Sequence, residues 1–269
     1  MELNKVQERY LMKTKVNRSS FQSKKVDIII PFHENQGKLS ILIKNMVMSI
    51  RSNPYRITVV DDGSTDTRFI NELKNFDKNR PTGTIPILQT VRSDIQLGFG
   101  GAVKLGLMNT HFPYVLVMHS DCVIESPHFM YEMGKTLIKL KDKNVKLVSA
   151  RTDNPKTGDP RLKGSMTNPV PDIILEDNFA SLFCFMCQRE LFNKIGPLKE
   201  YPYTGYEDEE FYHRMKFYGY KQAICGTAWI KHEGGGTMKK LLLNENVKKE
   251  VDKNRDRCIN DLRQLYSKK

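Results

Sequence analysis

Residues 56–66 read Arg-Ile-Thr-Val-Val-Asp-Asp-Gly-Ser-Thr-Asp, an apolar run that ends in two carboxylates and a glycine turn. β-Branched residues followed by Asp-Gly predict a short buried strand and a tight turn. The adjacent Asp61 and Asp62 repel each other, so their pairing needs a reason. Polar residues at the end of a buried strand are typical of the ligand-binding edge of an open α/β sheet.

The pattern continues along the chain as short apolar runs that alternate with helical periods. Predicted strands cover 26–31, 56–60, 85–91, 114–118, 145–150, 181–187 and 221–230. Predicted helices cover 38–52, 64–73, 98–109, 127–141, 190–195 and 207–218. Strands and helices that alternate through short connections form a mostly parallel sheet that is covered on both faces. The sequence therefore predicts an α/β, Rossmann-like fold.

Changes of composition divide the chain into three parts. We expect an N-terminal arm at 1–25, a main domain at 26–237 with halves at 26–150 and 151–237, and a tail at 238–269. Residues 152–178 are rich in Pro, Gly, Asp and Asn, which predicts a long loop, and such loops are usually functional or mobile.

The tail has the pattern of an amphipathic helix. Its apolar positions are Leu243, Val247, Val251, Cys258, Leu262 and Leu265. A helix with one apolar stripe must bury it. Packing on its own domain is the first expectation and a homodimer the second. Contact with an anionic membrane is the third, because the stripe contains no Trp or Phe.

Bulk properties restrict the class of protein. The formal net charge is +12, which indicates an anionic partner such as nucleic acid, a membrane surface or a nucleotide-sugar. No run approaches the ~18 apolar residues that span a bilayer, and residues 1–25 lack the apolar core of a signal peptide. Five irregularly spaced cysteines do not suggest a disulfide framework. A soluble cytoplasmic protein is expected, with peripheral membrane contact as an alternative.

Further chemistry-bearing residues stand at the ends of later predicted elements. His119-Ser120-Asp121 follows the strand at 114–118, and His232 follows the strand at 221–230. Carboxyl ends of parallel strands share one edge of a sheet, so these residues are expected to approach Asp61 and Asp62. Asp121 is the strongest candidate for a metal ligand. His119 is a candidate ligand, a sugar contact or a packing residue, and imidazole suits Mn²⁺ better than Mg²⁺.

The order of these motifs resembles family 2 glycosyltransferases with the GT-A fold, over roughly residues 26–237. The resemblance implies that 26–150 is the nucleotide-binding half and 151–237 the acceptor half. It implies that the acidic pair Glu207-Asp208 supplies a catalytic base, Asp208. It implies a metal site of Asp121, His232 and His119, where His119 replaces the family's first aspartate. The donor-binding residues implied are Pro31, His33, Glu34, Asp61, Asp62, Gly98, Gly101, Lys104 and Ser120.

The function implied by the resemblance is metal-dependent, inverting transfer from a nucleotide-sugar to an acceptor hydroxyl. The expected donor is a UDP-, GDP- or dTDP-sugar, and the expected cofactor is a divalent ion, Mn²⁺ rather than Mg²⁺. The acceptor stays open between a glycan, a lipid-linked and a protein hydroxyl.

Alternatives remain at this stage. A sugar nucleotidyltransferase usually carries a glycine-rich phosphate loop after its first strand, whereas this chain has Pro31-Phe-His-Glu34. A glycosyltransferase-like binding protein that has lost metal binding is favoured only by His119. A nucleic-acid binder would need interleaved aromatic and basic residues, which are missing, so no nucleic acid is expected. The glycines at 98–101 suit either phosphate binding or close helix packing.

Overall fold

The computed structural model describes residues 21, 23–34, 38–50, 55–66, 71, 87–126, 128–153, 158–233 and 242–268. Its strands are β1 (Val26–Phe32), β2 (Tyr55–Asp62), β3 (Ile87–Ser93), β4 (Tyr114–Met118), β5 (Cys122–Val123), β6 (Val145–Arg151), β7 (Ile173–Leu175), β8 (Cys184–Gln188), β9 (Lys221–Trp229) and β10 (Lys231–His232). Its α-helices are α2 (Lys38–Ser49), α4 (Gly98–Met108), α5 (Phe129–Lys139), α6 (Arg189–Ile195), α7 (Glu207–Phe217) and α9 (Glu245–Tyr266). Short 3₁₀ turns occupy η1 (Lys141–Lys143) and η2 (Pro160–Leu162).

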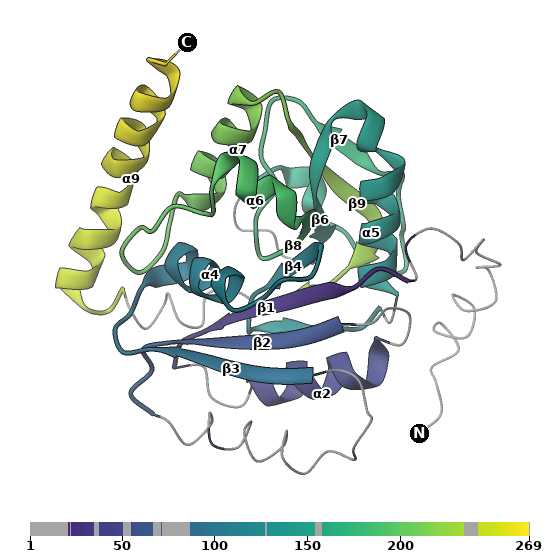
Figure 1. Ribbon diagram of the computed structural model, residues 1–269, viewed down its shortest axis with the longest axis horizontal. Coiled ribbons are helices and arrows are strands. Elements are labelled where there is room, and N and C mark those ends of the chain that lie inside the picture. The colour runs from purple at the N-terminus through teal and green to yellow at the C-terminus, as the bar shows by residue number, and fades with distance from the viewer. Residues whose placement is uncertain are drawn as a thin grey trace.

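Eight strands form one central sheet in the order β3-β2-β1-β4-β8-β6-β9-β7 (Figure 1). The pairs β2–β3, β1–β2, β1–β4 and β6–β9 are parallel, whereas β8 is antiparallel to both of its neighbours. The predicted α/β architecture with a mostly parallel sheet is therefore confirmed. The orientation of β8 is a feature that the strand pattern alone did not predict.

The two faces of the sheet bury separate apolar clusters because successive side chains in a strand point to opposite faces. Ile28 and Ile30 of β1 pack with α2 and α5 in one cluster. Ile29 packs with α4, α6 and α7 in the other. A strand that is buried on both faces reads as a continuous apolar run, which is why β1 could be recognised in the sequence.

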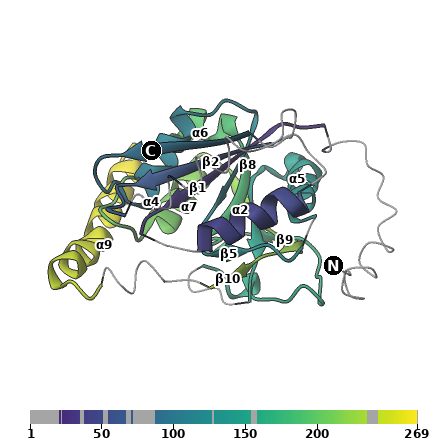
Figure 2. The same cartoon turned by 90° about the horizontal axis from the view of Figure 1, so that it is seen from below.

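A second, two-stranded sheet lies apart from the central one. β5 and β10 pair antiparallel, so that Cys122 lies opposite His232. β5 also contacts α2, beside which both strands lie in Figure 2. This small ribbon brings the segment that follows β4 next to the segment that follows β9.

Several predicted boundaries need correction. The segment 152–178 is not a continuous loop, because η2 and β7 lie within it and β7 pairs with β9. The strand predicted at 181–187 begins only at Cys184, since Leu182 and Phe183 form a turn. Most of the helix predicted at 64–73 lies outside the described residues.

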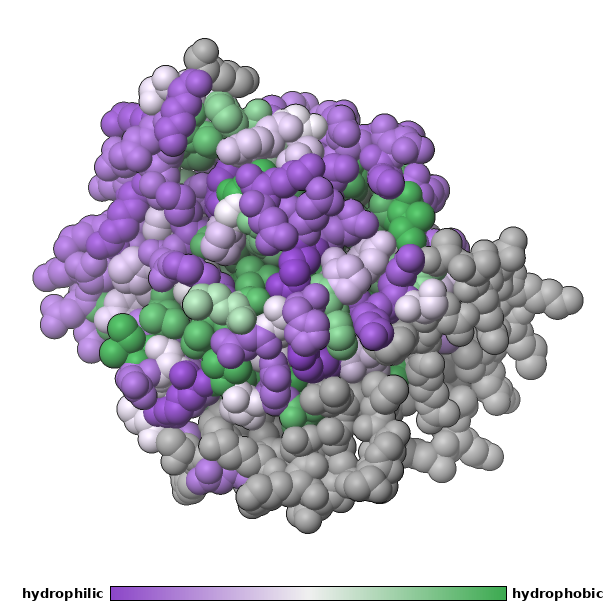
Figure 3. All heavy atoms as spheres, viewed as in Figure 1, coloured by the Kyte–Doolittle hydropathy of each residue, from purple (hydrophilic) through white to green (hydrophobic). Residues whose placement is uncertain are grey.

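The tail forms the helix α9, which packs against α7. The side chain of Asn244 caps it by accepting hydrogen bonds from the backbone N–H groups of Asn246 (3.0 Å) and Val247 (3.4 Å). Packing within the chain, the first of the three expectations, is thus confirmed for the helix, in which Val247 and Cys258 are buried. Leu243, the first residue of the predicted stripe, does not share this packing, because it precedes α9 and is 84% exposed. On the face shown in Figure 3, the edge along α9 is mostly hydrophilic. Among the described helices, none is both long and apolar enough to cross a bilayer.

Candidate active site

The turns after β1 and β2 are hydrogen-bonded to each other. The Nδ1 atom of His33 lies 2.8 Å from the backbone oxygen of Asp62, and the N–H of Glu34 donates to Oγ of Ser64 at 3.0 Å. The hydroxyl of Thr65 donates to Oε1 of Glu34 at 2.7 Å. Desolvation acts to raise the pKa of Glu34, but the hydrogen bonds from Thr65 outweigh it and lower that pKa. The first-strand turn and the Asp-Asp-Gly turn therefore form one structural unit.

Both aspartates of this turn accept hydrogen bonds within the chain. Asp61 is fully buried and pairs with Arg92, while its Oδ1 accepts from the N–H of Ser64 at 3.0 Å. Asp62 accepts from the N–H of Leu97 at 2.6 Å and from that of Gly98 at 3.0 Å. The repulsion between the carboxylates is thus offset by an arginine and by the backbone at the start of α4. Their direct role in donor binding stays a prediction.

The glycines at the start of α4 allow the helix to approach the segment 198–203. Gly98 has a φ of +78°, and a Cβ there would lie 2.5 Å from the backbone oxygen of Tyr201. A Cβ on Gly100 would lie 1.9 Å from the backbone oxygen of Lys199. Close packing therefore accounts for both glycines. At Gly101 a Cβ would instead collide with the side chain of Leu97, at 2.6 Å.

Lys104 and Ser120 take different positions from one another. The Nζ atom of Lys104 donates to Glu200 at 2.5 Å in an exposed ion pair. Ser120 is buried in the turn that separates His119 from Asp121. Ser120 thus lies between two candidate metal ligands. Lys104 points elsewhere, toward Glu200 in the stretch that precedes α7.

His119, Asp121 and His232 form a compact cluster at the carboxyl edge of the sheet. One potential ligand atom from each lies within 4.8 Å of the others. Nε2 of His232 is 3.2 Å from Oδ1 of Asp121, without the angles of a hydrogen bond, so this buried nitrogen lacks a hydrogen-bond partner among the described residues. The two imidazole rings meet edge to face at 5.3 Å. The three predicted metal-site residues are therefore brought together.

Aromatic side chains hold the two histidines in place. Phe183 stacks on His232 with a ring separation of 4.9 Å and an interplanar angle of 15°. Phe99, from the glycine-rich segment, contacts His119 edge to face at 4.9 Å. The backbone N–H of His232 donates to Asp153 at 3.3 Å. The sequence pattern did not indicate these three partners, although Phe99 stands between Gly98 and Gly100 of the glycine-rich segment.

The surroundings of His119 and Asp121 keep these two groups in the protonation states that metal ligation needs. Burial, reinforced by His232, lowers the pKa of His119 to about 4, so its imidazole is neutral at pH 7. Desolvation acts to raise the pKa of Asp121, but the closeness of His232 and His119 outweighs it and lowers that pKa. Neutral imidazole and ionised carboxylate are the forms that bind metal. The residues present thus fit a divalent ion of nitrogen and oxygen preference.

Asp208 lies in the first turn of α7 and is connected to the cluster through two intervening residues, Leu182 and Phe183. Its Oδ2 atom accepts a hydrogen bond of 3.2 Å from the backbone N–H of Leu182. The next residue, Phe183, stacks on His232 and accepts a 2.8 Å hydrogen bond from the N–H of His119. The turn at 182–183 therefore connects Asp208 with both histidines, through the backbone N–H of Leu182 on one side and Phe183 on the other.

The other acids of α7 have structural surroundings. Glu207 is 2% exposed and accepts a 2.5 Å hydrogen bond from the N–H of Gly205. Burial, together with the neighbouring Asp208, raises the pKa of Glu207 to about 8. Glu210 forms two hydrogen bonds with Arg214, at 3.0 and 2.6 Å. The acidic run is thus divided between a buried protonated residue, a candidate base and a buried ion pair, and the helix dipole favours acids in this turn.

Comparison with known proteins identifies the family of the chain. A family model described as "Glycosyl transferase family 2" matches residues 27–196, more than half of the chain. The chain therefore belongs to glycosyl transferase family 2. A search of curated proteins finds no significant match.

Solved structures with the GT-A fold resemble the chain at low sequence identity. "GalNAc-T7 with UDP, GalNAc and Mn2+" matches with 15% identity, a TM-score of 0.61, and coverage of 79% of this chain and 44% of that one. The mannosyltransferase PcManGT from Pyrobaculum calidifontis, "in complex with GDP-Man and Mn2+", matches with 16% identity, a TM-score of 0.60, and coverage of 84% and 62%. S. aureus TarS 1–349 matches with 16% identity, a TM-score of 0.57, and coverage of 77% and 60%. The chain spans less than two thirds of the length of each of these proteins, and the likeness shows the shared fold.

Proposed function

We propose that the chain is a metal-dependent, inverting glycosyltransferase that moves a sugar from a nucleotide-sugar to an acceptor hydroxyl, with Asp208 as the base. The observation that carries this proposal is the turn at 182–183. It contacts Asp208 through the N–H of Leu182 and contacts both histidines of the cluster through Phe183. A cluster that could hold an ion for the diphosphate, with a carboxylate nearby that could take the proton of the acceptor, suits such a transfer.

His119, Asp121 and His232 would hold the divalent ion. The buried Nε2 of His232 and the carboxylate of Asp121 are available to it, and the mixed nitrogen and oxygen donors suit Mn²⁺ better than Mg²⁺. When bound, such an ion supplies positive charge to the diphosphate leaving group. The titles of two related structures name Mn²⁺ together with UDP or GDP-mannose, which supports an ion and a nucleotide-sugar donor here.

Asp208 would accept the proton of the acceptor hydroxyl as that oxygen attacks the anomeric carbon. Attack opposite the departing nucleoside diphosphate inverts the anomeric centre and needs no covalent intermediate. The N–H of Leu182 orients the carboxylate by binding Oδ2. Glu207, protonated at neutral pH because of its burial, adds no second negative charge beside the base.

The donor nucleoside would lie along the turn formed by Pro31, His33 and Glu34 with Asp61 and Asp62. This turn is connected to the cluster, because Asp62 binds the N–H of Gly98 and the adjacent Phe99 contacts His119. The donor screen below identifies the nucleotide and the sugar, and transfer assays with candidate acceptors identify the acceptor.

A thermal-shift screen tests the proposal with UDP-, GDP- and dTDP-sugars, each with and without Mn²⁺. A ligand at ~100 times its dissociation constant adds about 2.7 kcal/mol of stability. We expect a shift with one donor class only when Mn²⁺ is present, and we expect it to disappear in Asp121→Asn but not in the exposed control Asp142→Asn. A screen in which no nucleotide-sugar stabilises the protein would contradict the proposal.

Turnover assays separate the remaining alternatives. Release of a nucleoside diphosphate from the bound donor, dependent on Mn²⁺, supports the transferase. Tight donor binding without any release indicates a binding protein. Release of pyrophosphate from a nucleoside triphosphate and a sugar phosphate would indicate a nucleotidyltransferase.

A further inference from the structure

The segment that leads into Asp208 has an unfavourable backbone conformation. Tyr203 has a φ of +65°, Gly205 of +114° and Tyr206 of +72°. Residues other than glycine adopt such angles at a cost, and they keep them only where surrounding groups hold the backbone in place. Tyr206 immediately precedes α7, so the conformation of 203–206 determines where the first turn of α7 begins.

The group that holds this segment comes from α9. Asn254 is fully buried, although it lies in a helix whose other buried side chains are Val247 and Cys258. Its Nδ2 donates to the backbone oxygens of Pro202 (2.9 Å) and Thr204 (3.0 Å), the two residues that flank Tyr203. A buried amide is costly unless it is fully hydrogen-bonded. Asn254 satisfies this condition, because its Nδ2 donates to these two carbonyls and its Oδ1 accepts from Nη1 of Arg257 at 2.6 Å.

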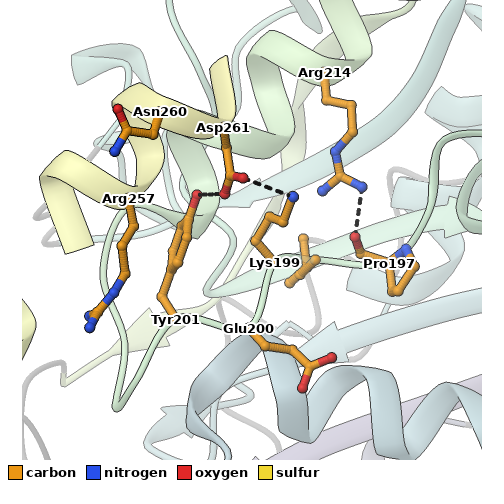
Figure 4. A pocket seen from close by; sticks show the side chains of 9 residues that line it. Pro197, Lys199, Glu200, Tyr201, Arg214, Arg257, Asn260 and Asp261 are labelled. Atoms are coloured by element: carbon orange, nitrogen blue, oxygen red, sulfur yellow. Dashed lines mark hydrogen bonds and ion pairs between the residues drawn. The ribbon is translucent and has the colours of Figure 1, made fainter. Parts of the chain in front are cut away.

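A second residue of α9, Asp261, contacts the stretch that immediately precedes residues 202–206. Asp261 accepts hydrogen bonds from the hydroxyl of Tyr201 at 2.9 Å and from Nζ of Lys199 at 3.1 Å, as Figure 4 shows. Beside these contacts lies an open hollow of about 620 Å³, lined by both α9 and residues 197–201. Asn254 and Asp261 therefore attach α9 to residues 199–204 through specific polar contacts.

The opposite side of the segment contacts the metal-side cluster. The backbone oxygen of Tyr203 accepts a 3.2 Å hydrogen bond from the N–H of Phe99, whose ring contacts His119. Gly205 donates its N–H to Glu207, the neighbour of Asp208. A displacement of 202–206 would thus move the start of α7 relative to the cluster.

From these contacts we infer that Asn254 is a positioning residue, through which α9 fixes the segment 202–206 and hence the place of Asp208. This inference rests on the proposed function of Asp208. It assigns a role in the reaction to a helix that lies outside residues 27–196, which the family model matches. Asn254 acts on the backbone that leads to the base, since its side chain bonds to Pro202, Thr204 and Arg257.

The first test compares steady-state kinetics of Asn254→Ala with those of Asn260→Ala, a matched control because Asn260 is an exposed asparagine of the same helix. Donor turnover is measured with the nucleotide-sugar that the screen identifies, well below the melting temperature. A misplacement of about 1 Å costs on the order of 10²-fold in rate. We therefore expect kcat of Asn254→Ala to fall by roughly 10- to 100-fold. KM for the donor and the affinity for Mn²⁺ should not change.

Two further variants extend the test, and the first of them remains informative if Asn254→Ala folds poorly. Tyr201→Phe removes only the hydroxyl that donates a hydrogen bond to Asp261. We expect its kcat to fall less than that of Asn254→Ala and its stability to be normal. In the background of Asp208→Asn, Asn254→Ala should lower the rate little further, because both changes act on the same base. Full additivity in this double variant, or an unchanged kcat in folded Asn254→Ala, would overturn the inference.

Hydrogen exchange provides a readout that does not depend on activity. Peptides that cover 199–210 should exchange faster in Asn254→Ala than in the wild type, and Asn260→Ala should leave their exchange unchanged. Unchanged exchange in Asn254→Ala would overturn this inference alone. A wild-type protein that binds donor without turnover would instead contradict the proposed function, so the two failures are distinguishable.

Discussion

Oδ2 of Asp208 accepts a hydrogen bond from the backbone N–H of Leu182, although the two residues belong to different elements. Leu182 precedes β8, which runs antiparallel between β4 and β6. The start of β8 therefore lies beside the end of β4, where His119 begins the metal-side cluster. The antiparallel strand is the reason that a carboxylate of α7 and a cluster at the carboxyl edge of β4 lie close together.

Replacement of Asp208 by Asn is the most direct test of the base. The amide keeps the shape of the side chain but cannot take the proton of the acceptor, so transfer should fall by a factor on the order of 10²–10⁴. Donor affinity, measured by calorimetry with Mn²⁺, should hardly change because the acceptor side is altered. Glu209→Gln, in the same turn, serves as the control and should keep normal transfer. A large loss of donor affinity with normal turnover would assign Asp208 to the donor site.

The metal site is tested by Asp121→Asn. Loss of the only carboxylate of the cluster should abolish both Mn²⁺-dependent donor binding and transfer, whereas circular dichroism should show a persisting fold. His119→Asp should retain or raise activity with Mg²⁺, because it restores a hard oxygen ligand. Normal turnover in Asp121→Asn would exclude this cluster as the site of an essential ion.

The protonation of His119 gives a prediction that needs no substrate. Burial lowers its pKa to about 4, so an NMR titration of the metal-free protein should show its imidazole changing charge near pH 4. In the unfolded chain this histidine binds its proton near pH 6.5, so between these values the unfolded state holds more protons. The contribution of His119 to stability is therefore present above pH 6.5 and is lost as the pH falls toward 4. A titration midpoint near 6.5 would show that the ring is open to solvent.

Local sequence patterns were sufficient for the strand ends that carry Asp61, Asp62 and Asp121. Each follows an apolar run that is buried on both faces, and such runs are recognisable without knowledge of their neighbours. The contacts of Phe183 were not predictable in this way, because its partners His119 and His232 are distant in sequence and are brought near by the direction of β8. The contacts of Asn254 with residues 202 and 204 are equally non-local. They end on backbone carbonyls, which every residue has, so no residue type in the sequence indicates them.

Glu207 should make the protein less stable as the pH rises through neutrality. Its pKa is about 8 in the folded state because of burial, compared with about 4.5 for an ordinary glutamate. Between these values the folded state holds the extra proton, so stability should decrease by about 1.4 kcal/mol for each pH unit. Glu207→Gln has no proton to lose, so denaturant unfolding at pH 5 and pH 8 should show this decrease in the wild type and not in the variant. Equal pH dependence in both proteins would mean that Glu207 is ionised in the fold.

The glycine at position 100 should be essential for the contact between α4 and the segment that leads to Asp208. A Cβ there would lie 1.9 Å from the backbone oxygen of Lys199, so Gly100→Ala must displace either the helix or the segment. Overpacking of this kind typically costs about 1–3 kcal/mol, and the backbone oxygen cannot rotate away as a flexible side chain would. Gly219→Ala is the matched control, because Gly219 has a φ of +73° but nothing lies within 4 Å of its added Cβ. That control should lose only about 1 kcal/mol from its backbone conformation.

Urea unfolding should therefore rank the proteins, in decreasing stability, as wild type, Gly219→Ala and Gly100→Ala. Only Gly100→Ala should also lose transfer activity per folded molecule. If Gly100→Ala were as stable and as active as Gly219→Ala, the close approach of α4 to residue 199 would not be what holds the start of α7 near the metal-side cluster.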